Sequence, residues 1–199
     1  MPFVSDPVAL PGLAALATGV FAFLCALLLA RLRGRRAPDV ADGKRRNASI
    51  GWIVVQGLSY ALVGMGPILT TRDPLSPGAI LTALTVLLLM LVATAVFDAS
   101  SRALGQNWAL VARTRGDASL IETGPFAHVR NPIYGAMLLV LVAMALACGH
   151  LASLLIALPV FALGTAMRIR AEEAVLRATF GSAYERYAAR VKRFVPGLF

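Results

Sequence analysis

Long apolar runs separated by short polar segments dominate the sequence, and they predict helices that cross a membrane. Several runs reach or approach the ~20 apolar residues that a helix needs to span about 30 Å of hydrocarbon, and no alternating pattern suggests a barrel. We therefore predict an all-α fold, an integral membrane helical bundle of about five transmembrane helices with a C-terminal amphipathic helix. The predicted spans are Val8–Ala30, Ile50–Thr70, Gly78–Phe97, Ile133–Cys148 and Leu151–Arg168.

The last two predicted spans come from one apolar stretch, which we interpret as a tight helical hairpin. From Ile133 to Met167 the chain is almost continuously apolar for 35 residues, and a single helix of that length would be about 52 Å long, more than any bilayer needs. Gly149 and His150 form the only polar, flexible interruption, so the turn is expected there. Such a hairpin brings the segment before its first arm next to the segment after its second.

The residues beyond the hairpin have the pattern of a helix with one apolar face. The apolar positions recur at three- and four-residue spacing, which predicts an amphipathic helix lying on the cytoplasmic face, kinked at Gly181 and ended by Pro196. We divide the chain into an N-terminal block of three helices, residues 1–97, and a second region, residues 98–199, that begins with a polar connector from Asp98 to Asn131. The apolar positions of the tail are Leu176, Phe180, Tyr184, Tyr187, Val191 and Phe194.

Composition and charge support a membrane protein and give its orientation. Hydrophobic residues make up 58% of the 199 residues, against roughly 45–50% in soluble domains. The net charge of +9 is distributed by topology: eighteen of the nineteen basic residues fall on one face of a five-span protein, and Arg72 alone is left for the other. We expect a multi-pass protein of the bacterial inner membrane with a cytoplasmic active site and no nucleic-acid partner; the oligomeric state is left open.

A polar, irregular segment at the start of the hairpin is the candidate site. Gly124 to Gly135 contains an arginine, a histidine and two prolines next to an apolar run, and the acidic pair Glu172-Glu173 follows the fifth predicted span on the same face. Irregular backbone at membrane depth is tolerated where protein or a water-filled cavity satisfies its polar groups, so we predict a pocket. The residues expected to meet there are Gly124, Pro125, His128, Arg130, Asn131 and Tyr134 on one side and Arg168, Arg170, Glu172 and Glu173 on the other.

In these two segments the sequence resembles the isoprenylcysteine carboxyl methyltransferases and the related phospholipid N-methyltransferases. The resemblance runs from Arg102 onward, about half of the chain, and does not include the first two spans. It rests on Leu104 to Trp108, Gly124-Pro125-Phe126, Arg130-Asn131-Pro132, Tyr134, Glu172-Glu173, Leu176, Phe180-Gly181, Tyr184, Tyr187 and Pro196.

The resemblance implies that the two segments bind S-adenosyl-L-methionine and that no metal is required. Arg130 suits the carboxylate of the cofactor, Glu172 and Glu173 suit its ammonium and ribose hydroxyls, and Gly124 allows close backbone approach. The implied cofactor-binding residues are Gly124, Pro125, His128, Val129, Arg130, Asn131, Tyr134, Glu172 and Glu173. Arg130 and Arg168 are the expected catalytic residues, and Arg170, Asn107 and Trp108 are expected to contact a lipophilic or lipid-like acceptor.

One position departs from the family pattern, which has a histidine where this chain has Asn131. Asparagine can reproduce the hydrogen bond of a neutral imidazole but cannot titrate, so an acid–base role does not carry over to this position. His128, three residues earlier, is the candidate that could compensate. A carboxylate acceptor would need no base, whereas an amine or thiol would.

Other interpretations of the same residues stay open at this point. Arg130 alone could be an anchor at a helix start, and the acidic pair could be a solvated helix start paired with Arg168 and Arg177 at four-residue spacing. Membrane sterol reductases have a similar C-terminal region that binds NADPH, and a non-catalytic membrane scaffold would retain the bundle alone. The sequence does not identify the methyl acceptor.

Overall fold

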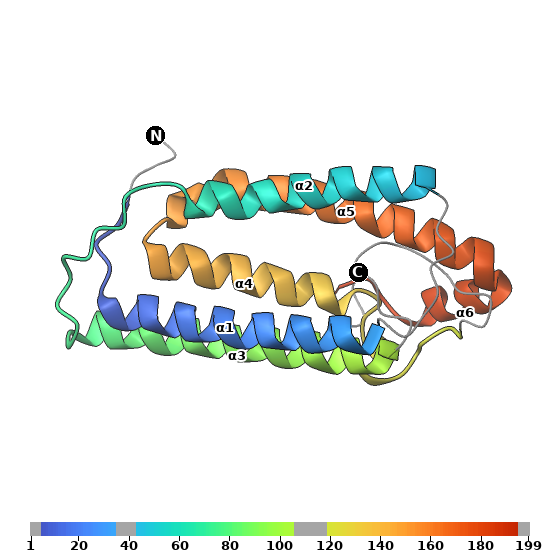
Figure 1. The fold of residues 1–199 in the computed structure, drawn as a ribbon, viewed down its shortest axis with the longest axis horizontal. Helices are drawn as coiled ribbons and strands as arrows, with labels where there is room; N and C mark the ends of the chain where they lie inside the picture. Colours follow the sequence, from blue (N-terminus) through green and yellow to red (C-terminus); the bar gives the residue numbers. More distant parts are fainter. Residues whose placement is uncertain (1–4, 35–42, 106–118, 195–199) are drawn as a thin grey trace.

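The computed structural model describes residues 5–34, 43–105 and 119–194, with backbone only at residues 34 and 43–50. Figure 1 shows an elongated bundle in which the described segments form helices, so the all-α prediction is confirmed. The helices are α1 (Leu10–Gly34), α2 (Gly43–Gly64), α3 (Pro77–Leu104), α4 (Pro132–Cys148), α5 (Leu154–Phe180) and α6 (Ser182–Arg190), with 3₁₀ turns η2 at Gly124–Ala127 and η3 at Leu151–Ser153.

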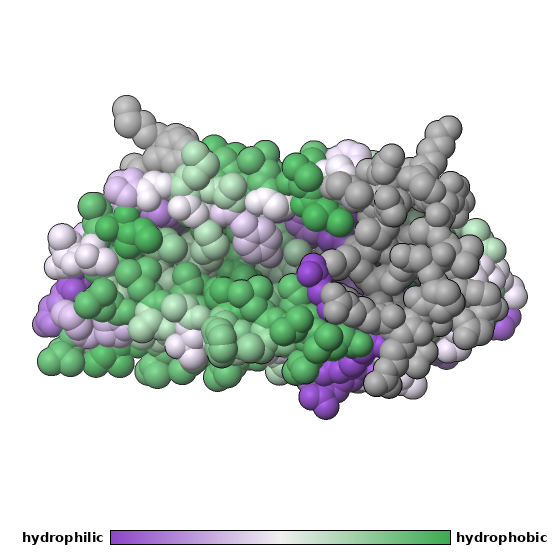
Figure 2. All heavy atoms as spheres, viewed as in Figure 1, coloured by the Kyte–Doolittle hydropathy of each residue, from purple (hydrophilic) through white to green (hydrophobic). Residues whose placement is uncertain are grey.

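Three of the described helical segments are long and apolar enough to cross a membrane, which makes the protein an integral, multi-pass membrane protein. They are Leu10–Arg33, Pro77–Leu104 and Leu151–Phe180, and shorter apolar helices occupy Gly51–Gly64 and Pro132–Cys148. Large apolar side chains on these helices are exposed, for example Phe21 at 70% and Leu155 at 81%. The apolar belt between the polar ends of the bundle is visible in Figure 2 and suits contact with lipid tails.

Local sequence signals explain where the helices begin and end. Ser76 caps α3, since its hydroxyl accepts a hydrogen bond from the backbone N–H of Ala79 at 3.3 Å, and a proline occupies the first position of α3 and of α4. Gly149 ends α4 in the left-handed region at φ 74°. A side chain there would meet a backbone oxygen of Asp6 at 2.3 Å, so only glycine fits.

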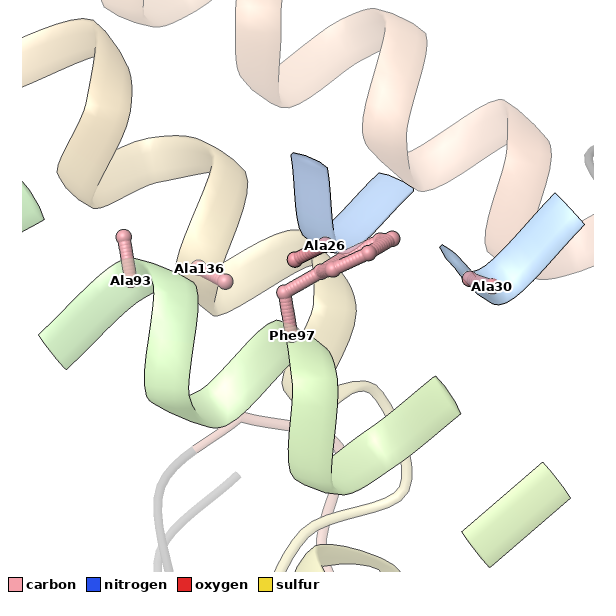
Figure 3. Packing of buried hydrophobic residues seen from close by; sticks show 5 residues of the cluster. All are labelled: Ala26, Ala30, Ala93, Phe97 and Ala136. Atoms are coloured by element: carbon pink, nitrogen blue, oxygen red, sulfur yellow. The ribbon is translucent and has the colours of Figure 1, made fainter. Parts of the chain in front are cut away.

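The packing joins helices that are not neighbours in the sequence. α1 lies against α3, α4 packs mainly on α3, and α5 packs mainly on α2 (Figure 1). Figure 3 shows how alanines on three helices leave room for the ring of Phe97, which lies over Ala26. Small residues let helix backbones approach closely, and packing of this kind holds membrane helices together where the hydrophobic effect does not act.

Two predicted boundaries in the N-terminal half are wrong. The second helix ends at Gly64, so residues up to Thr70 lie in the loop rather than in the span. The third helix extends past Phe97 to Leu104, so the polar connector begins later than Asp98. The two-part division at residues 97 and 98 stays a prediction, and α3 runs unbroken across it.

The C-terminal half also differs from the prediction. The turn lies at Gly149 and His150 as expected, but the hairpin is not tight, because α4 and α5 pack mainly on other helices. The fifth helix continues past Arg168 to Phe180, and Gly181, at φ 50°, breaks it instead of kinking it. The prediction of a single amphipathic tail helix is therefore wrong: its first part belongs to α5, its middle forms α6, and Val191 and Phe194 lie beyond the end of α6. Pro196, its predicted end, lies outside the described residues.

Candidate active site

The two predicted halves of the site meet at the end of the bundle that carries α6 (Figure 1). The hydroxyl of Tyr134 at the start of α4 donates to Glu172 of α5 at 2.6 Å, and a guanidinium nitrogen of Arg130 lies 3.3 Å from a carboxylate oxygen of Glu173. The prediction that these segments are neighbours is confirmed, although it was derived from a tighter hairpin than the one observed. Glu173 with Arg130 therefore forms the first corner of the candidate site, and Glu172 with Tyr134 forms the second corner.

The segment before α4 is held by the chain that follows α6. Val129 pairs with Lys192 in an isolated parallel β-bridge. The backbone N–H of Arg130 donates to the carbonyl of Lys192 at 2.8 Å, and that of Asn131 donates to the carbonyl of Arg193 at 3.1 Å. The side-chain amide of Asn131 donates to the same carbonyl at 3.3 Å. Asn131 therefore secures the backbone on which Arg130 is mounted.

The first corner is a cluster of arginines around one buried carboxylate. Glu173 is 3% exposed. Arg193 donates to both of its oxygens, at 2.9 and 2.7 Å, while Arg130 and Arg177 each lie 3.3 Å away. Three guanidiniums around one carboxylate leave an excess of positive charge, which suits an anionic ligand. Because Arg193, Arg130 and Arg177 all contact its oxygens, Glu173 is better placed to orient them than to bind a ligand directly.

The second corner lies one residue earlier on α5 and faces the bundle. Arg168 is 9% exposed, and its guanidinium carbon lies 5.1 Å from the centre of the Tyr134 ring and one nitrogen 3.7 Å from Glu172. Within the described chain, both Tyr134 and Arg168 contact Oε1 of Glu172. Both of these contacts are made to one oxygen of a half-buried carboxylate.

The short helix α6 covers the first corner. Tyr184 and Tyr187 are buried at 1% and 4% exposure, as their prediction as packing residues requires. Burial raises the pKa of Tyr187 to about 12, so its hydroxyl stays protonated at neutral pH and donates to the carbonyl of Phe126 at 2.8 Å. The hydroxyl of Tyr184 lies 3.4 Å from a nitrogen of Arg130. Hydrogen bonding to Glu173 raises the pKa of Arg193.

The remaining predicted site residues fall into three groups. Gly124, with φ 61°, and Pro125 form the 3₁₀ turn before the β-bridge, and His128 is exposed at its end. Arg170 is exposed on α5 with its guanidinium near the sulfur of Met167, so it is not part of either corner. Asn107 and Trp108 lie outside the described residues. The roles of all these residues in binding stay predictions.

The structure argues against two simpler interpretations, that Arg130 is an anchor at the membrane surface and that the acidic pair is a solvated helix start. The side chain of Arg130 is only 12% exposed and faces Glu173, which does not fit an anchor that reaches out to the membrane surface. The acidic pair lies in the interior of α5 rather than at a helix start. The expected four-residue pairs do form, between Arg168 and Glu172 and between Arg177 and Glu173.

Several residues that the sequence analysis did not select belong to this arrangement. Arg193 was indistinguishable among the basic residues of the tail, and Gln56 of α2 lay in a helix with no assigned role. The signal for Gln56 was present, since a buried amide in an apolar helix needs polar partners. Its partners are Thr165 and Arg168 of α5.

The first corner fits the carboxylate of the expected cofactor. Nε of Arg130 is buried, and in the described part of the chain it donates no hydrogen bond. A buried N–H without an acceptor is costly, and a carboxylate ligand would satisfy it. The chemistry of the residues therefore agrees with a ligand that carries both an anionic and a cationic group.

Comparison with known proteins identifies a family. A family model described as phospholipid methyltransferase (PEMT) matches residues 80–183, just over half of the chain. The match begins in α3, earlier than the resemblance noted from the sequence, and ends at the start of α6, so it includes Arg130, Glu172 and Glu173 but not Arg193. No curated protein matches the chain.

Proposed function

The chain belongs to the phospholipid methyltransferase family, and from this membership we propose that it methylates the headgroup amine of a phospholipid at the α6 end of the bundle. The protein is a membrane methyltransferase of a family that uses S-adenosyl-L-methionine. That membership sets aside the NADPH reductase and the non-catalytic scaffold. The identity of the acceptor and the residue roles below are the proposed part.

The proposal rests on one observation. The first corner, which is cationic, and the second corner, which offers the carboxylate of Glu172, are built on adjacent residues of α5. Arg130, whose Nε donates no hydrogen bond within the described chain, binds the carboxylate of the cofactor, and Glu173, itself held by Arg193, fixes the guanidinium of Arg130. Gly124 lets the backbone approach the bound molecule closely. S-adenosyl-L-methionine supplies a methyl group on a positively charged sulfur, which is transferred in line to the acceptor.

Glu172 acts on the acceptor. A phospholipid amine is protonated at neutral pH and must lose a proton before its nitrogen can attack. Oε2 of Glu172 attracts the ammonium and accepts that proton, while Tyr134 and Arg168 fix the carboxylate through Oε1. The nitrogen–carbon bond forms as the sulfur–carbon bond breaks, and the proton passes from Glu172 to water. Asn131, in place of the usual histidine, takes no part in proton transfer.

We also propose five membrane spans with the active site on the cytoplasmic face of a bacterial inner membrane. Apolar helices α2 and α4 are shorter than the three long spans, and both become spans if the bilayer thins locally around them. Arg31, Arg102 and Arg130 gather at the α6 end and Arg72 at the other, in keeping with the positive-inside rule. This places both corners at the level of phospholipid headgroups.

The test is methyl transfer in liposomes of defined composition. Purified protein is incubated with methyl-labelled cofactor and vesicles of phosphatidylethanolamine, its monomethyl and dimethyl forms, or phosphatidylcholine, and lipids are separated to locate the label. We expect label in the ethanolamine-containing lipids and none in phosphatidylcholine, which has no free position on nitrogen. A parallel incubation contains a prenylated cysteine instead of a phospholipid amine, and label that appears only there, as in an isoprenylcysteine carboxyl methyltransferase, would refute the proposed acceptor.

A further inference from the structure

A network of polar side chains inside the bundle links α2 to the second corner, which contains Glu172. Gln56 is 2% exposed on α2. Its Nε2 donates to the hydroxyl of Thr165 at 2.8 Å, and its Oε1 accepts from Arg168 at 2.9 Å. Arginine can only donate, so the amide oxygen must face Arg168 and the nitrogen must face Thr165. The orientation of the glutamine is therefore fixed by chemistry.

The network adds a directional contact to a long side chain that also meets Glu172 and Tyr134. Arg168 has a long, flexible side chain, and Glu172 at 3.7 Å attracts it without setting a hydrogen-bond direction. The bond from Arg168 to Gln56 is shorter and directional. It holds the guanidinium where its carbon lies over the ring of Tyr134, whose hydroxyl binds the same glutamate.

The backbone is built for this contact. A side chain at Gly164 would lie 3.0 Å from the backbone nitrogen of Gln56, so glycine allows α2 and α5 to approach closely enough for one glutamine to reach Thr165 and Arg168. Tyr60, one turn further along α2, donates to the carbonyl of Met137 in α4 at 2.7 Å. α2 therefore contacts both helices that carry the site, and those two helices pack little on each other.

We propose that Gln56 is a positioning residue for methyl transfer, acting through Arg168 to hold the Tyr134–Glu172 corner in its reactive geometry. The inference rests on the proposed function, and it gives a role to a helix outside the family match at residues 80–183. Gln56 does not touch the Arg130 corner. Its loss therefore affects turnover rather than cofactor affinity.

The test compares Gln56→Met with Gln56→Glu and a matched control. Methionine keeps the size but loses both hydrogen bonds, and we expect kcat to fall between roughly tenfold and a hundredfold, since a misplacement of about 1 Å can cost that much. The dissociation constant of S-adenosylhomocysteine should stay within about threefold, which is less than the loss of a single hydrogen bond to the ligand would cause. Gln56→Glu still accepts from Arg168, and Thr165 can donate to its second oxygen, so kcat should recover.

Ser59→Ala is the matched control. Ser59 is also buried on α2, and among the described residues its hydroxyl donates to the carbonyl of Gln56 at 2.6 Å, within the same helix. We expect this variant to keep the wild-type kcat. A purely structural role for Gln56 predicts that Gln56→Met and Ser59→Ala lower stability and kcat together, and that result would overturn the proposal.

Two further measurements test the role of Gln56 if Gln56→Met does not fold or if the wild type methylates no phospholipid. If Gln56→Met does not fold, Thr165→Val removes the partner that orients the amide, and kcat should fall and recover in Thr165→Ser; equal kcat in both would overturn the proposal. If the wild type methylates no phospholipid, the proposed function fails on its own. A structure of Gln56→Met then decides: a guanidinium displaced from the Tyr134 ring supports positioning, and an unmoved guanidinium overturns it.

Discussion

Replacing Arg130 separates cofactor binding from structural support, because the chain provides an almost ideal control. Arg130 and Arg177 each lie 3.3 Å from an oxygen of the same carboxylate, Glu173. The side chain of Arg130 is 12% exposed and that of Arg177 is 44% exposed. If these arginines served only to neutralise Glu173, Arg130→Gln and Arg177→Gln would have similar consequences.

Arg130 and Arg177 have different proposed roles, so replacing them should change the affinity for the cofactor by different amounts. Arg130→Gln removes a charge-assisted hydrogen bond to the cofactor carboxylate, worth about 1.5–3 kcal/mol in a partly buried site. At 1.4 kcal/mol per tenfold, the affinity should fall roughly tenfold to 150-fold. Arg177→Gln removes the ion pairs of a half-exposed arginine with the buried Glu173 and the exposed Glu185. Exposed pairs contribute about 0–1 kcal/mol each, and because Arg177 is not assigned to the cofactor, the cofactor affinity should change by no more than about twofold.

Calorimetric titration with S-adenosylhomocysteine measures both variants, and thermal unfolding checks their integrity. Both should unfold near the wild-type temperature, because Glu173 keeps the two hydrogen bonds of Arg193 in either case. Wild-type affinity in Arg130→Gln, or equal weakening in both variants, would refute the assignment of Arg130 to the cofactor.

Three further predictions concern topology and packing. Arg45→Cys should resist a membrane-impermeant thiol reagent in intact cells while Leu75→Cys, exposed in the loop before α3, should react; labelling at position 45 would reject the five-span orientation. Gly149→Ala should destabilise the fold by about 1–3 kcal/mol in thermal unfolding, because φ is 74° and the new carbon would lie too close to the backbone oxygen of Asp6. Gly57→Ala, where the new carbon meets nothing within 4 Å, should leave the stability unchanged, and equal effects of the two changes would contradict this reasoning. Tyr187→Phe should cost about 1–3 kcal/mol by leaving a buried carbonyl without its donor, and unchanged denaturant unfolding would argue that water replaces the hydroxyl.

The contact between the two segments, Gly124–Tyr134 and Arg168–Glu173, was accessible from the sequence because a few residues mark where helices begin and where the chain turns. Pro132 marks the first turn of α4, and Gly149 with His150 marks the reversal. These two signals fix which ends of the helices coincide, and hence that Arg130 and Glu173 meet. The contact survives even though the arms of the hairpin separate, because long side chains span the distance between α4 and α5.

Helix boundaries were harder to predict from the sequence, since hydropathy marks the residues that lie in the membrane and not all of the residues that form the helix. The apolar run of α3 stops at Phe97, but nothing breaks the backbone until Gly105, so the helix continues into water. Likewise a membrane helix and an amphipathic helix share one period, so the passage from one to the other at Arg168 left no signal. Only Gly181, with its positive φ, ends α5.

The details of the charged cluster could not be predicted because they depend on tertiary structure. Arg193 reaches Glu173 only because the chain after α6 pairs with Val129, and a single bridge of this kind has no periodic pattern. Gln56 and Arg168 are more than a hundred residues apart in the chain. Their contact requires the packing of α2 on α5, which the sequence order of the helices does not reveal.

An experimental structure with S-adenosylhomocysteine bound would show directly whether the two segments form one cofactor site. We expect the carboxylate of the ligand to lie within hydrogen-bond distance of Arg130 and its sulfur to face Glu172 and Tyr134. A ligand bound between α1 and α3, or one that leaves Nε of Arg130 without an acceptor, would contradict the proposal that Gly124 to Tyr134 and Arg168 to Glu173 form one cofactor site.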